Sequence, residues 1–180
     1  MFRLKFLLAL VVAFVLMLCF RALAFTIVTI EGEGLLPVFL RGDRVLVNRW
    51  SYGLRVGSDK GILPYCRIGR STMQRGDLVV FENPLDESEV LICRCKALPG
   101  DTIVHHGKET VVPGRVNCAA ADHYWMEAVS TENMLDSRTL GFIPEQLIIG
   151  RATTVVYSHN SKEPFWRGWR SQRILLPLDE

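Results

Sequence analysis

The amino-acid sequence predicts a mostly β protein, with an antiparallel β-sheet domain behind one N-terminal transmembrane helix. An uninterrupted apolar run from Phe6 to Phe20 predicts the helix. After it, short β-rich runs alternate with Gly, Pro, Asn and Asp turn signals, and no amphipathic helical pattern appears. The expected division is a cytoplasmic N-terminus (1–5), a transmembrane anchor (6–25) and an extracytoplasmic β domain (26–180).

The predicted anchor carries positive charges near both ends. Arg3 and Lys5 precede the apolar run, so the N-terminus is expected in the cytoplasm and the rest of the chain outside. A lone span needs about 20 residues, so the anchor has to continue past Arg21, whose long side chain can reach the interface. The sequence therefore favours a single-pass protein of the cytoplasmic (inner) membrane, with its C-terminal domain on the periplasmic side.

Two other interpretations of the N-terminal segment stay open. Residues 22–24 (Ala-Leu-Ala) form a small-x-small pattern behind a hydrophobic region, as in a cleavable signal peptide. Cys19 is a candidate lipid acceptor of a lipoprotein signal, although Leu18 before it is larger than the small residue usual there. Cleavage after Ala24 would release the β domain, whereas a retained span would hold it at the membrane.

Period-two alternation and turn residues place the expected strands of the β domain. Residues 25–30 leave the membrane directly as a strand. The later strands lie within 43–50, 76–84, 89–98, 122–129, 146–158 and 171–178. A hairpin is expected about Gly107-Lys108. Residues 56–75, rich in Gly, Ser, Arg and Lys, are expected to form a loop.

Composition argues against several classes of function. The chain has 180 residues and a net charge of +2 without a dense basic block, so we expect one domain plus an anchor and no nucleic-acid binding. No Cys-x-x-Cys or Cys/His spacing supports a zinc site, so we expect no metal and no cofactor. Four cysteines beyond the anchor allow three disulfide pairings, and the sequence does not choose among them: Cys66, Cys93, Cys95 and Cys118.

Four sequence boxes, in order behind one anchor, resemble those of the bacterial type I signal peptidase family (S26 family). These membrane-anchored Ser/Lys proteases remove signal peptides from exported proteins. The boxes are GLLPVFLRGD (34–43), RGDLVVFENP (75–84), CRCKALPGD (93–101) and MLDSRTLGFIP (134–144). The resemblance covers nearly everything from the anchor to the C-terminus. It implies a signal-peptidase-type β fold with a core of two antiparallel sheets.

The resemblance also implies a Ser nucleophile, a Lys general base, a second oxyanion donor and a supporting Ser, and this chain replaces each of those side chains. The positions, in that order, are Gly34, Cys93, Gly32 and Met134. The family's Asp and Arg in the last box remain as Asp136 and Arg138, for which the resemblance implies a structural supporting role.

Relocated chemistry is the alternative. Cys93 offers a thiol near the expected site, but a thiol nucleophile needs a base. Lys96 lies three residues along the same strand and should face the opposite side. His105 and His106 are expected to be solvent-exposed turn histidines, and Glu33 a flexible-loop acid.

In the family, the signal peptide adds a strand to an extended cleft with two shallow apolar pockets. The matching positions are all apolar here: Ile30, Leu35, Pro37, Phe39, Leu91 and Ile92. An ordinary β core would show the same pattern. Gly42 and Asp43 are expected to support the shape of the loop.

Two functional hypotheses follow. The first is a catalytically degenerate signal peptidase I-like membrane protein at the protein-export exit. Its expected partners are the membrane, the signal-peptide region of exported preproteins, and a catalytic signal peptidase or the translocation machinery. The second is an active peptidase that hydrolyses signal peptides with a non-standard nucleophile such as Cys93. The joint loss of nucleophile, base and oxyanion donor favours the first hypothesis.

Overall fold

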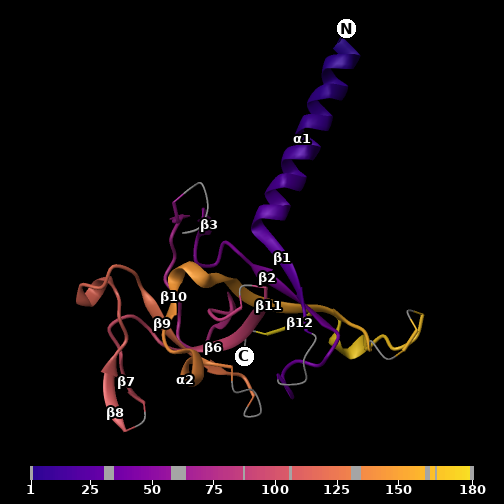
Figure 1. The fold of residues 1–180 in the computed structure, drawn as a ribbon. Helices are drawn as coiled ribbons and strands as arrows, with labels where there is room; N and C mark the ends of the chain where they lie inside the picture. Colours follow the sequence, from indigo (N-terminus) through magenta and orange to yellow (C-terminus); the bar gives the residue numbers. More distant parts are fainter. Residues whose placement is uncertain are drawn as a thin grey trace.

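The computed structural model describes residues 2–30, 35–57, 64–86, 88–105, 107–130, 135–160, 163–164 and 166–178. Helix α1 (Phe2–Ala24) leads without a break into strand β1 (Phe25–Thr29), as the sequence predicts for the start of the β domain. Figure 1 shows α1 extending away from the β domain, with the N-terminus at its far end. Within the described ranges, no helix is both long enough and apolar enough to cross a membrane.

Eight of the described strands form one antiparallel sheet in the order β1-β2-β11-β5-β6-β9-β10, with β12 beside β11. After β1, the strands of this sheet are β2 (Asp43–Asn48), β5 (Leu78–Glu82), β6 (Val90–Ala97), β9 (His123–Ala128), β10 (Ile143–Pro144), β11 (Ile148–Ser158) and β12 (Leu176–Pro177). Two separate hairpins accompany it: β3 (Leu54–Val56) with β4 (Cys66–Ile68), and β7 (Thr102–His105) with β8 (Lys108–Val111). The short helical turns are η1 (Arg115–Asn117), α2 (Ser137–Leu140), η2 (Glu145–Leu147) and η3 (Ser171–Arg173).

The sheet carries a hydrophobic core on each of its faces. Val79 and Phe81 of β5 belong to one cluster, whereas Leu78 and Val80 belong to the other. All four side chains are buried, because alternate residues of a strand face opposite sides of the sheet and here both sides are covered. Strand β5 is therefore the buried centre of the domain.

The single sheet corrects the expected core of two antiparallel sheets. Strand β11 joins the two halves, because Arg151 pairs with Asn48 of β2 on one side and with Val79 of β5 on the other. Register shifts along β11, such as the one between Ala152 and Thr154, are the irregularities at which a sheet bends. The domain is thus one curled sheet rather than two stacked ones.

Most predicted strands are confirmed, and the hairpin at Gly107-Lys108 forms between β7 and β8. The prediction for 171–178 is wrong for most of its length: residues 171–173 form the turn η3, and only β12 is extended. The predicted loop 56–75 contains β4, which pairs with β3. Its Arg67 is buried and donates to the carbonyls of Gly53 and Glu145, which holds this hairpin against the domain.

Replacing Phe81 with Ala tests whether β5 is the centre of the core. Because Phe81 is 0% exposed, the truncation should lower the free energy of unfolding by about 3–5 kcal/mol through lost burial and a cavity. Leu85→Ala is the control, since Leu85 is 78% exposed and its removal should cost less than about 0.5 kcal/mol. Chemical denaturation measures both, and equal effects would contradict the central placement of β5.

Candidate functional site

The loop of the first box is closed by backbone hydrogen bonds at its two ends. Ile30 N–H donates to the Asp43 carbonyl at 2.9 Å, and Gly42 N–H donates to the Ile30 carbonyl at 2.8 Å. Gly42 has a φ of 91°, a conformation that favours glycine. The end of β1 and the start of β2 are therefore held together. Gly32 and Gly34 lie between them, outside the described residues, as does Glu33.

The Asp43 carboxylate lies at the base of this loop. Asp43 is 0% exposed, and its Oδ2 accepts a hydrogen bond from the Leu40 N–H at 2.9 Å. The same oxygen accepts from Nη2 of Arg173 at 2.6 Å. A buried carboxylate needs such partners, because an unpaired buried charge is strongly destabilising.

Four of the six predicted cleft residues lie together. Ile30, Phe39 and Ile92 are buried in one cluster, and the half-buried Leu35 packs against it. Leu91 lies in the cluster on the opposite face of the sheet, and Pro37 is exposed. The apolar wall beside the loop is therefore formed by Ile30, Leu35, Phe39 and Ile92.

Cys93, at the position of the family's base, is a buried thiol. It is 0% exposed on β6, opposite Val79 of β5 and Ala128 of β9. Its Sγ lies 3.7 Å from the carbonyl oxygen of Leu135. Burial, reinforced by the negative charge of Asp136, raises the pKa of the Cys93 thiol to about 12. At neutral pH this side chain is uncharged and a poor nucleophile.

Asp136 and Arg138 form a structural ion pair beside Cys93. Asp136 caps the N-terminus of α2: its carboxylate accepts hydrogen bonds from the Arg138 N–H at 2.9 Å and the Ala128 N–H at 3.0 Å. The Arg138 Nη2 lies 2.7 Å from Oδ2 of Asp136. Burial opposes ionisation of Asp136, but Arg138 and the two backbone donors outweigh it and lower its pKa. Met134, before this turn, lies outside the described residues.

Ser137 is a contributor to the site that sequence reasoning missed. Its Oγ accepts a hydrogen bond from the Met126 N–H at 2.8 Å, and the residue is fully buried. This bond and the one from Ala128 to Asp136 join α2 to β9. The Asp-Ser pair of the last box is the sequence signal, because Asp and Ser favour helix N-termini.

The other candidates for relocated chemistry lie apart from Cys93. Lys96 is exposed at 65%, faces the opposite side of β6 as predicted, and lies 3.6 Å from Glu127. His105 was expected to be exposed, but its half-buried ring packs edge-on against Trp125, with 5.0 Å between the ring centroids. His106 lies outside the described residues.

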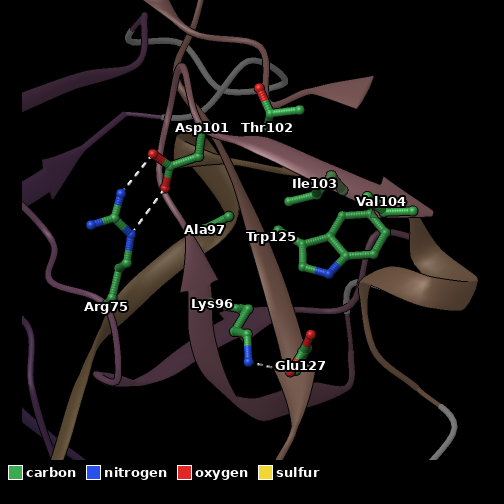
Figure 2. A pocket seen from close by; sticks show the side chains of 9 residues that line it. All are labelled: Arg75, Lys96, Ala97, Asp101, Thr102, Ile103, Val104, Trp125 and Glu127. Carbon is green, nitrogen blue, oxygen red and sulfur yellow. Dashed lines mark hydrogen bonds and ion pairs between the residues drawn. The ribbon is translucent and has the colours of Figure 1, made fainter. Parts of the chain in front are cut away.

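An open hollow of about 450 Å³ lies beside Lys96, between β6, β9 and the start of β7. Figure 2 shows its two charged pairs, Arg75 with Asp101 and Lys96 with Glu127, around the indole of Trp125. The Arg75 guanidinium donates two hydrogen bonds to Asp101, at 2.6 and 3.1 Å. This contact joins the second box to the Pro-Gly-Asp turn of the third, so both charged residues have structural partners.

The four cysteines beyond the anchor were candidates for disulfides, and no metal site was expected. Cys93 and Cys95 are buried and free, and Cys66 and Cys118 are exposed and free. Among the residues that the structure describes, no three His, Cys, Asp or Glu side chains gather as a metal site.

Comparison with known proteins relates this chain to signal peptidases. The family model described as "Signal peptidase, peptidase S26" matches residues 3–120. A signal peptidase I of Buchnera aphidicola subsp. Schizaphis graminum is 32% identical over 230 aligned positions, covering 81% of this chain and 72% of the relative. Another, from Buchnera aphidicola subsp. Baizongia pistaciae, is 31% identical over 91 residues, 49% of this chain and 28% of the relative.

The similarity extends to mitochondrial proteases. Mitochondrial inner membrane protease subunit 2 of Saccharomyces cerevisiae is 34% identical over 90 residues, which are 48% of each chain. The match therefore spans less than half of this protease subunit, and of the Baizongia relative it spans 28%.

Thiol labelling tests the state of Cys93. With its pKa raised to about 12 by burial, Cys93 at neutral pH carries far less thiolate than an unperturbed thiol. Iodoacetamide at pH 7 should therefore modify the exposed Cys66 and Cys118 first and leave Cys93 unreacted in the folded protein. Peptide mapping by mass spectrometry measures this. Preferential labelling of Cys93 would contradict the buried, protonated thiol.

The Asp136 ion pair predicts a pH-dependent stability. Because folding lowers the pKa of Asp136, its stabilisation is present above the unfolded pKa of about 3.9 and is lost as the pH falls through the lower folded value. Asp136→Asn should cost about 1–3 kcal/mol at pH 7 and flatten the acid limb of the stability curve. Glu109→Gln, on the exposed face of β8, is the control and should change neither. An unchanged acid limb in the Asp136 variant would refute the assignment.

Proposed function

Because this chain belongs to the peptidase S26 family of signal peptidases, we propose that it is a membrane-anchored, non-catalytic member that binds the signal-peptide region of exported proteins. The observation that carries the proposal is Cys93, a fully buried thiol with a raised pKa at the position of the family's base. A catalytic relative and the translocation machinery are the proposed neighbours at the export exit.

The absence of catalysis follows from what peptide hydrolysis requires. A hydroxyl nucleophile must lose its proton to a neighbouring base, and Gly34 has no side chain to supply the hydroxyl. A protonated thiol in place of the lysine cannot accept that proton. Cys93 as a replacement nucleophile would need a thiolate, which its raised pKa opposes, and Lys96 faces away from it.

Peptide binding is supported by the apolar wall beside the first-box loop. Ile30, Phe39 and Ile92 form its buried base, and the half-buried Leu35 lies next to the segment that carries Gly34. An extended peptide gains affinity from main-chain hydrogen bonds and specificity from shallow pockets that take alternate side chains. Neither contribution needs a nucleophile or a base, so peptide binding does not require catalysis.

The proposed location at the membrane rests on the exposed apolar side chains of α1 and the positive charges near its N-terminus. The large apolar side chains from Phe6 to Leu18 are between 43% and 66% exposed, a surface that suits an apolar environment. Arg3 and Lys5 favour a cytoplasmic N-terminus, which supports a periplasmic location for the β domain (26–180).

A combined binding and cleavage assay tests the proposal. The purified chain should bind a synthetic signal peptide that spans a cleavage site, measured by fluorescence anisotropy, and should leave it intact in mass spectra after prolonged incubation. Leu35→Asp should weaken binding at least about tenfold, because it places a charge in the apolar wall. Val104→Asp, on the 71% exposed face of β7, is the matched control and should leave binding unchanged.

The variant Cys93→Ala separates the two functional hypotheses. It should bind the peptide like the natural chain, because Cys93 lies in the cluster opposite the apolar wall. Cleavage that disappears in Cys93→Ala would establish the relocated-nucleophile alternative. Cleavage that persists in it would reject both that alternative and the non-catalytic proposal.

A further inference from the structure

The guanidinium of Arg173 bridges two points of the first-box loop. Its Nη2 donates to Oδ2 of Asp43 at 2.6 Å and to the carbonyl oxygen of Val38 at 2.7 Å, and its Nε donates to Oδ2 of Asp43 at 3.1 Å. The side chain of Arg173 is 16% exposed and that of Asp43 is 0% exposed. Arg173 lies 130 residues after Asp43 in the sequence. Its side chain therefore holds both the loop backbone at Val38 and the carboxylate of Asp43.

Arg170 makes a second contact from the same segment. Its Nη1 donates to the carbonyl of Arg41 at 3.0 Å and to Oγ of Ser158 at 2.8 Å. It also lies 3.9 Å from Oδ1 of Asp43. The two arginines thus contact the loop at Val38 and Arg41, and at its end they contact Asp43, the first residue of β2.

The segment that carries these arginines is itself fixed to the sheet. Arg170 N–H donates to the carbonyl of Ser158 at 3.1 Å, and β12 pairs with β11. Strand β11 lies beside β2, which follows the loop directly. The two arginines therefore link the loop to strand β11.

The charge of Asp43 makes this contact decisive for the loop. Without Arg173, a buried carboxylate would keep only the more distant Arg170 as a cation among its described contacts. The loop would have to open to hydrate the charge, since an unpaired buried carboxylate is costly. Opening would displace Phe39, which is fully buried and closes the apolar wall.

We propose that Arg173 is a positioning residue for the peptide-binding loop, which it holds in place through Asp43 and the Val38 carbonyl. The proposal assigns the C-terminal segment a part in the site that the sequence boxes do not contain. The positioning of the loop by Arg173 does not depend on what the loop binds, whereas the effect of Arg173 on peptide affinity rests on the proposed function.

Hydrogen–deuterium exchange of the full chain tests the loop directly. In Arg173→Gln, amides in peptides that cover 35–43 should exchange at least tenfold faster, and affinity for the synthetic signal peptide should fall at least tenfold. Arg173→Lys should give intermediate values, because a single ammonium cannot reproduce the fork that reaches Asp43 and Val38 together. This variant keeps the proposal testable where the glutamine variant fails to fold.

Arg67→Gln is the matched control. Arg67 is buried and, like Arg173, donates to backbone carbonyls, here those of Gly53 and Glu145, but it holds the β3–β4 hairpin. Its loss should lower global stability and leave exchange at 35–43 and peptide affinity unchanged.

The outcomes separate the two proposals. Equal acceleration of loop exchange in the Arg67 and Arg173 variants would overturn the positioning role, and so would unchanged peptide affinity despite a loosened loop. A natural chain that binds no peptide, with loop exchange accelerated only in the Arg173 variants, would support the positioning role and reject the proposed function.

Discussion

Burial of β5 on both faces is the constraint on which the rest of this domain depends. Because β5 has apolar side chains on both sides, each of its faces must be covered by a core, one that includes Tyr52 and Met73 and one that includes Ile30 and Phe39. Cys93 is paired with Val79 of β5, so its side chain points into one of these cores. Such a site disfavours any charge. An amine there would be kept neutral and basic, whereas a thiol there is kept neutral and inert.

Residues of the boxes that remain have structural partners that account for them without catalysis. Asp43 holds the loop through Arg173, and Asp136 caps α2 and joins it to β9. Arg75 and Asp101 tie the second box to the turn of the third. Each of these groups loses a buried or bidentate contact when it is replaced, so folding alone gives a reason to keep it.

The sequence predicts the strands whose apolar side chains define the sheet, because alternation in β2 and the apolar runs of β5 and β6 depend only on burial. Prediction from the sequence fails where polar side chains pack against the interior of the domain. The buried Arg67 and the half-buried Arg173 are held by contacts with distant carbonyls and a carboxylate, which no hydropathy pattern contains. For the cleft, strand periodicity already separates Leu91 from Ile92, since consecutive residues face opposite sides. The segment with Gly32 and Gly34 carries no apolar pattern of its own.

Packing around Cys93 also bears on whether a lysine could occupy this position. The site of Cys93 is closed, with no exposed surface and with the Leu135 carbonyl 3.7 Å from the sulfur. A lysine there would add several heavy atoms to a filled core, and such overpacking costs about 1–3 kcal/mol or more. The buried site would keep the lysine amine neutral, but the surrounding side chains would first have to move apart to make room for the lysine. Whether position 93 holds a lysine or a cysteine therefore changes core packing as well as chemistry. A match to the family's sequence boxes does not reveal this packing difference.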